Sequence, residues 1–267
     1  MTVKIAYKNS ILKKNVNNVV FFVDEKFDIS NIKKYISIAE YNYTKDLLKT
    51  KDLKKKIIIS EISSKKKIIL VCIQKNIKNY ETVNLGAKFY EYVTTLKGKE
   101  YRLHIDYLPT KQENFISNFL HGFKLKSYIF DKYKSKKDKK DFDVYVIGKK
   151  IPSISDQIKF KSIEEGTFYT RDLVSEPGNI LHPDEYAKRI NSLKKLGLKI
   201  NILDEKKLKK LGMNTLLGVG QGSIRGSYLV SIEWNGKKDK SKPLAFVGKG
   251  VCFDTGGISL KPAKFME

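Results

Sequence analysis

Three runs of consecutive apolar residues place the strongest constraint on the fold of this chain. They lie at 19–23, 57–59 and 68–73 and are rich in valine, isoleucine and phenylalanine. Both faces of such strands must be covered, which is typical of a parallel or mixed sheet flanked by helices. Apolar residues at helical spacing follow in two later stretches, 85–96 and 115–123. The sequence therefore predicts an α/β fold built on a parallel or mixed sheet.

Shorter patterns predict the remaining elements. Pro183, with Asp184 and Glu185 beside it, indicates the start of a helix, because acidic residues suit the positive end of the helix dipole. The glycines of 218–223 resemble a phosphate loop only weakly, so a turn that bounds a strand is expected there. Further strands are expected at 1–7, 102–107, 142–147, 199–203, 228–234 and 244–247, and further helices at 156–173, 183–196 and 205–211.

The length and one break in the pattern predict two domains. A chain of 267 residues can form one large domain or two of medium size. The sequence Ile-Pro-Ser at 151–153 interrupts the alternation of strands and helices. We therefore expect an N-terminal α/β domain at 1–150, a linking helix at 151–173 and a second α/β domain at 174–267.

The net charge leaves two interpretations open. The chain has 53 lysine and arginine residues against 29 aspartate and glutamate residues, a formal charge of +24. Such a charge suits nucleic acid or another acidic partner. Alternatively it reflects composition alone, because lysines are spread along the whole chain and arginine, which reads bases by paired hydrogen bonds, is scarce. We favour the second interpretation and expect any binding of nucleic acid to be weak.

Other features of composition bear on location. Cys72 and Cys252 are the only cysteines, so a disulfide framework is excluded and a reducing, cytoplasmic environment is expected. No apolar run approaches the ~20 residues that cross a bilayer, so no membrane partner is expected. The histidines, His104, His121 and His182, do not fall at the spacing of metal ligands, and we expect them to be structural or exposed.

The segment from 244 to 262 carries the clearest signal of chemistry. A strand over 244–247 would end at a glycine-rich turn, where backbone can approach a ligand closely. Lys249, Asp254 and Lys261 surround that turn. A carboxylate is a hard oxygen ligand for divalent cations. From these residues alone, a flexible surface turn with solvated charges remains the alternative.

The string Gly-Lys-Gly-Val-Cys-Phe-Asp-Thr-Gly-Gly-Ile-Ser-Leu-Lys-Pro at 248–262 resembles the first metal-binding motif of the leucyl aminopeptidases, the cytosolic two-metal exopeptidases. Cys252 stands where threonine is usual in that family. Stretches upstream are similar to the family as well, and the resemblance extends from about residue 120 onward. These stretches are 122–134, 170–183 and 211–223, the last resembling the strand before the family's active site.

The resemblance implies roles for three residues. Lys249 would ligate one metal, Asp254 would bridge two divalent ions (Mn²⁺ or Zn²⁺), and Lys261 would be the catalytic lysine that polarises the scissile carbonyl. The implied activity is metal-dependent hydrolysis that releases N-terminal amino acids from peptides. Family members are cytosolic and assemble as hexamers through the catalytic domain.

The resemblance also implies further groups that do not occur in these 267 residues. They are another aspartate ligand, an Asp-x-Glu pair and an arginine, all beyond the position that matches Glu267. We therefore expect the catalytic domain to be truncated and the isolated chain to lack activity. The alternative function is that of a non-catalytic remnant that binds a partner or DNA, as some bacterial relatives do.

Overall fold

The computed structural model describes residues 3–9, 18–96, 98–137, 141–237, 241–253 and 259–266. The chain divides into two compact units, Met1–Arg171 and Asp172–Glu267. In the described part of the chain, no helix is both long enough and apolar enough to cross a membrane.

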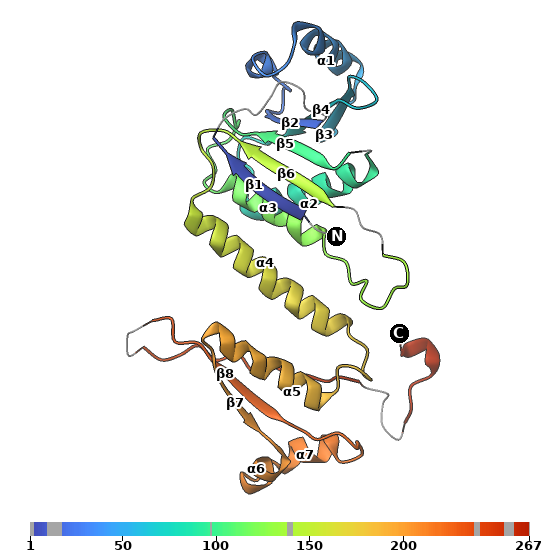
Figure 1. Cartoon of the computed structure of the whole chain (residues 1–267), viewed down its shortest axis with the longest axis vertical. Coiled ribbons are helices and arrows are strands. Elements are labelled where there is room, and N and C mark those ends of the chain that lie inside the picture. Colours follow the sequence, from blue (N-terminus) through green and yellow to red (C-terminus); the bar gives the residue numbers. More distant parts are fainter. Residues whose placement is uncertain are drawn as a thin grey trace. The chain divides into compact units, whose positions relative to one another are not determined.

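The first unit is built on a six-stranded sheet (Figure 1). All neighbouring strands run parallel except the last pair, β4 and β3, which is antiparallel. The predicted α/β fold with a mixed sheet is confirmed. In spatial order the strands are β1 (Val3–Lys8), β6 (Phe142–Ile147), β5 (Glu100–His104), β2 (Asn18–Val23), β4 (Lys67–Cys72) and β3 (Ile57–Glu61).

Helices cover both faces of this sheet, and the central strand β2 divides its side chains between them. Val20 and Phe22 pack into a core shared with α2 (Asn79–Thr95) and α3 (Phe115–Lys126). Val19 and Phe21 point into a second core with the 3-10 helix η1 (Ser30–Ile32) and α1 (Ile38–Thr50). The uninterrupted apolar run of β2 therefore has a direct cause, because neither face meets water.

Two glycines let α2 and α3 approach each other closely. A Cβ atom on Gly86 would collide with the carbonyl oxygen of Phe119, and one on Gly122 with the carbonyl oxygen of Val83. Each glycine therefore lies against the backbone of the opposite helix. A larger residue at either position would separate the pair.

A long helix, α4 (Ile154–Ser175), follows the sheet and packs against α3 and the residues after it. The imidazole of His121 lies 3.1 Å from the carboxylate of Glu164, and both side chains are largely buried. The guanidinium of Arg171 donates a hydrogen bond of 2.6 Å to the carbonyl oxygen of Leu125. The helix expected over 156–173 is therefore present.

The second unit has an antiparallel pair of strands, β7 and β8, with short helices around it (Figure 1). These strands and the helices near 183–196 and 205–211 agree with the predictions. The elements are α5 (Pro183–Asn191), η2 (Ser192–Leu196), β7 (Lys199–Leu203), α6 (Glu205–Lys210), α7 (Asn214–Gly220), β8 (Leu229–Glu233) and η3 (Ala263–Phe265).

Two local predictions in this unit are wrong. Residues 244–247 form no strand, and Phe246 and Val247 are 88% and 100% exposed. A strand is stabilised by a neighbouring strand, and no described strand pairs with this segment. The stretch around 216–220, expected to be a strand and turn, lies in helix α7 because Leu216 and Leu217 suit a helix as well as a strand.

Candidate functional site

The first turn of α5 gathers acidic side chains at the positive end of the helix. His182 is the N-cap, and its Nδ1 atom accepts a hydrogen bond from the backbone N–H of Glu185 at 3.4 Å. Pro183 occupies the first turn, where its missing N–H costs nothing. Asp184 and Glu185 then lie where the helix dipole favours negative charge.

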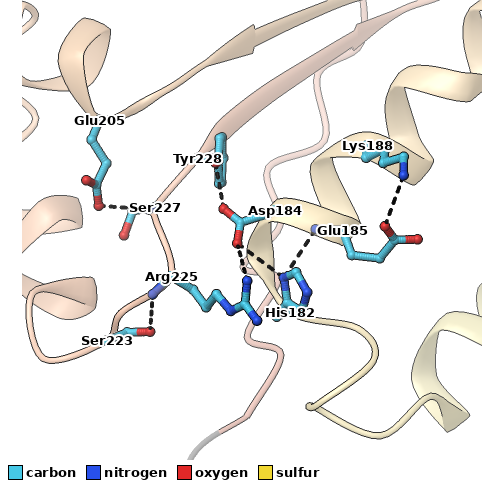
Figure 2. A network of polar contacts seen from close by, with 9 residues as sticks. All are labelled: His182, Asp184, Glu185, Lys188, Glu205, Ser223, Arg225, Ser227 and Tyr228. Carbon is cyan, nitrogen blue, oxygen red and sulfur yellow. Dashed lines mark hydrogen bonds and ion pairs between the residues drawn. The ribbon is translucent and has the colours of Figure 1, made fainter.

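Asp184 joins this turn to residues about 40 positions later in the chain, as Figure 2 shows. Its Oδ1 atom accepts a hydrogen bond of 2.7 Å from the hydroxyl of Tyr228. Its Oδ2 atom lies 3.2 Å from Nδ1 of His182 and 3.6 Å from the guanidinium of Arg225. The hydrogen bond from Tyr228, more than the Arg225 guanidinium, lowers the pKa of Asp184, and the same bond raises the pKa of Tyr228.

Arg189, on α5, forms ion pairs with its own helix and with the loop that precedes the helix. Its guanidinium lies 2.9 Å from a carboxylate oxygen of Glu185, one turn earlier, and 3.0 Å from Glu176. The Glu176 side chain is almost completely buried, so this ion pair is shielded from solvent on the loop side. The loop at 176–179 is therefore held against α5.

The glycine-rich segment lies against this loop and helix at two points. A Cβ atom on Gly178 would lie 3.0 Å from Cβ of Phe253 and 3.3 Å from the carbonyl oxygen of Cys252. A Cβ atom on Gly250 would lie 2.9 Å from the ring of Tyr186 on α5. The contacts of Gly178 and Gly250 place the start of the predicted metal motif beside the first turn of α5 and the loop that precedes it.

The three predicted site residues differ in how the structure places them. Lys249 is exposed, on a segment without helix or strand. Lys261 is half-buried and lies two residues before η3. Asp254 lies outside the described residues, as do its neighbours from 255 to 258. The roles of these residues in metal binding and catalysis therefore stay predictions.

The described residues alone do not make a complete metal site. No group of three or more His, Cys, Asp or Glu side chains in that part of the chain could hold a metal ion. An amine from Lys249 and a carboxylate from Asp254 are suitable donor types, but they supply only part of a coordination shell. Cys252 is half-buried, and burial raises the pKa of its thiol.

The network around Asp184 was not predicted from the sequence. The acidic pair after Pro183 indicated the helix start, but its partners Arg225 and Tyr228 lie 41 and 44 residues further on. No spacing rule connects a helix N-terminus with a residue at that separation. The network holds α5 to the start of β8, so its role is to stabilise the fold.

Comparison with known proteins finds a family and relatives that the second half of the chain resembles. Residues 168–267 match the family described as "Cytosol aminopeptidase family, catalytic domain". A probable cytosol aminopeptidase of Caulobacter vibrioides is 50% identical over 155 residues, which are 55% of this chain and 31% of that protein. One from Chelativorans sp. is 47% identical over 152 residues, again 55% of this chain and 31% of the relative. The matched part thus spans about a third of the curated relatives' length.

Solved structures agree in fold. A tomato leucine aminopeptidase mutant has a TM-score of 0.74 at 18% identity, over 96% of this chain and 55% of that chain. The cytosol aminopeptidase of Coxiella burnetii has a TM-score of 0.71 at 20% identity, over 97% and 52%. The bottromycin maturation enzyme BotP, solved in complex with Mn, has a TM-score of 0.67 at 20% identity, over 93% and 51%. The resemblance noted at 248–262 is thereby confirmed, because that stretch lies within the residues, 168–267, that match the catalytic domain of the cytosol aminopeptidase family.

Proposed function

We propose that this chain belongs to a metal-dependent aminopeptidase that releases N-terminal amino acids from peptides. The observation that carries the proposal is the family match over 168–267, which includes Lys249, Asp254 and Lys261. The likeness in fold to a neighbour solved with Mn supports a divalent metal as cofactor. The contacts of Gly250 with Tyr186 on α5 and of Phe253 with the loop at Gly178 support a fixed attachment for residues 250–253.

The proposed roles follow the donor chemistry of each side chain. Lys249 and Asp254 would hold divalent metal, which would supply Lewis-acid activation of the peptide carbonyl and of water. The ammonium of Lys261 would donate hydrogen bonds to the carbonyl oxygen of the scissile bond as negative charge develops there. In this proposal Asp254 is needed for metal binding, whereas Lys261 is needed for the rate of hydrolysis.

A second, non-catalytic function is favoured by a different observation. Leu244, Phe246 and Val247 are all more than 80% exposed immediately before the motif, and the chain carries +24 charge. A partner protein or nucleic acid would be the ligand of such a chain. This function needs neither Lys249 nor Lys261.

A chimera separates the two functions. The segment of the Caulobacter vibrioides relative that corresponds to residues 168–267 is replaced by the segment of this chain. Hydrolysis of leucine p-nitroanilide is then measured with and without added Mn²⁺, with the unaltered relative as the reference. We expect metal-dependent hydrolysis by the chimera, because this segment would supply its own lysines and aspartate.

Two variants complete the test. Lys261→Ala in the chimera should lower kcat by about 10²–10³, the usual effect of removing one preorganised electrostatic group. Lys264→Ala, which removes an exposed lysine three residues later, should leave the rate unchanged. A chimera that folds and binds Mn²⁺ but hydrolyses nothing would contradict the aminopeptidase proposal and favour the non-catalytic function.

A further inference from the structure

The first unit has a pocket at the carboxyl ends of two neighbouring strands, β2 and β5. After these strands the chain continues on opposite faces of the sheet. Strands β2 and β5 are parallel neighbours, with Phe21 paired to His104. After β2 the chain passes through η1 and α1, on one face of the sheet, and after β5 it enters α3 on the other face. Adjacent parallel strands whose connections diverge in this way leave a crevice at their carboxyl ends, which is where open α/β sheets bind ligands.

The pocket has room for one ring system. Its volume is about 170 Å³, and an apolar cavity of about 150 Å³ can hold benzene. Its aromatic walls come from three segments of the chain. The ring of His104 stacks on Phe21 at 5.1 Å between centroids and lies 4.5 Å from Tyr35. The three rings therefore form one packed aromatic cluster beside the pocket, an apolar border that suits a ring-shaped ligand.

His104, which lines the pocket, has a buried ring nitrogen without a hydrogen-bond partner among the described residues. The residue is only 7% exposed, and its Nδ1 atom has no hydrogen-bond partner among the described residues. Buried polar atoms are almost always paired, so a lone one next to a pocket needs an explanation. Burial lowers the pKa of His104 to about 4, so at neutral pH the imidazole offers one acceptor and one donor nitrogen.

Acidic groups complete the lining. Asp24, Asp28 and Asp106 all lie on the pocket, and no lysine or arginine is among the described residues that line it. The carboxylates are held in place: Asp106 accepts from the hydroxyl of Tyr35 at 3.0 Å, and Asp24 accepts from two backbone N–H groups. The pKa of Asp28 is lowered by hydrogen bonds from Ser30, so this carboxylate stays ionised. The ammonium of Lys34 lies 2.7 Å from the hydroxyl of Tyr107 at the edge of the pocket, but the three carboxylates outnumber it, so the lining favours N–H donors over anions.

We propose that this pocket is a binding site for a small planar heterocycle that carries N–H donors, the chemical class of a nucleobase. The ring would lie against the aromatic cluster of Phe21, Tyr35 and His104, and its N–H groups would face Nδ1 of His104 and the carboxylates. The site is independent of the peptidase motif, because every residue that lines it lies in the first unit.

The test uses the whole 267-residue chain with adenine as the probe and benzoate as a planar anion of similar size. Isothermal titration calorimetry should show saturable binding of one adenine per chain and no binding of benzoate. In ¹⁵N NMR spectra, the Nδ1 resonance of His104 should shift on addition of adenine, because that nitrogen gains a partner.

Variants locate the binding. His104→Phe keeps a stacking ring but removes the ring nitrogens, and should lower the affinity for adenine at least tenfold. Asp24→Asn keeps the oxygen that accepts the backbone bonds and removes one charge, so it should weaken binding about threefold without unfolding the unit. Tyr80→Phe, at an exposed position on α2, should have no effect.

Three results would overturn the proposal. They are no adenine binding by the folded chain, equal affinity for adenine and benzoate, and unchanged affinity in both His104→Phe and Asp24→Asn. Circular dichroism of each variant shows whether it is folded, so loss of binding through unfolding is recognised.

Discussion

The hydroxyl of Tyr228 donates a hydrogen bond of 2.7 Å to Oδ1 of Asp184, which ties the start of β8 to the first turn of α5. A hydrogen bond to a charged acceptor is stronger than one between neutral groups. We predict that Tyr228→Phe lowers the stability of the second unit by about 1 kcal/mol, a value reduced for partial exposure. Hydrogen exchange of the β8 amides should report the loss, and Tyr186→Phe, which keeps the ring against Gly250, is the matched control.

The same bond predicts a dependence on pH. Because folding lowers the pKa of Asp184, the bond's contribution is present above the ordinary aspartate pKa of 3.8 and is lost as pH falls through the lower, folded-state pKa. The difference in stability between the original chain and Tyr228→Phe should therefore be constant near neutral pH and shrink in acid. A difference that grows in acid would contradict this role for Asp184.

Gly86 and Gly122 lead to a prediction about the contact between α2 and α3. Gly86→Ala and Gly122→Ala should each destabilise the first unit by about 2 kcal/mol or more, because the new methyl group meets backbone that cannot move aside. Gly166→Ala in α4 is the control, since nothing lies within 4 Å of its Cβ position. That change should stabilise the helix by up to about 1 kcal/mol. Urea unfolding followed by circular dichroism measures all three, and equal effects would contradict the close packing.

His104 predicts acid sensitivity of the first unit. Its pKa is lowered from 6.5 to about 4 by burial, so between those values the unfolded chain binds a proton that the folded chain does not. Stability should fall as pH drops from about 6.5 to about 4, by about 3 kcal/mol from this residue. His104→Phe should remove that part of the pH dependence, whereas His182→Gln, in the second unit, should keep it. Urea titrations at pH 7 and pH 4.5 provide the comparison.

The charge of +24 gives a prediction about DNA. Lysines contact phosphates without reading bases, so binding should be weak, independent of sequence and steeply weakened by salt. Fluorescence anisotropy with two unrelated duplexes, from low salt to about 200 mM, measures this. Selective binding of one duplex that survives about 200 mM salt would show that the charge serves recognition.

The sequence predicted the first unit well because its strands are specified locally. The run at 19–23 is apolar on both faces, and burial in two separate cores is what it indicates. Helix α1 was missed because its buried contacts are few: Thr44 is its one fully buried residue among those described. The capping box formed by Ser37 and Glu40 was a usable signal, with the bonds Ser37 N–H to Glu40 and Glu40 N–H to Ser37 both present.

The second unit was harder to predict because its elements depend on distant partners. The stretch at 244–247 has the composition of a strand, yet a strand forms only where another strand pairs with it, and composition does not specify the partner. The Asp184–Tyr228 contact has the same character, since a separation of 44 residues leaves no local pattern. The motif at 248–262 was recognisable because its chemistry lies within one short stretch.

In the proposed aminopeptidase site, Asp254 holds metal and Lys261 supplies rate. The most direct measurement is metal content per chain, by mass spectrometry, beside kcat in the chimera carrying Asp254→Ala or Lys261→Ala. We predict that Asp254→Ala loses bound metal and activity together, whereas Lys261→Ala keeps its metal and loses about 10²–10³ in kcat. Equal loss of metal in both variants, or full metal content in Asp254→Ala, would contradict the assignment.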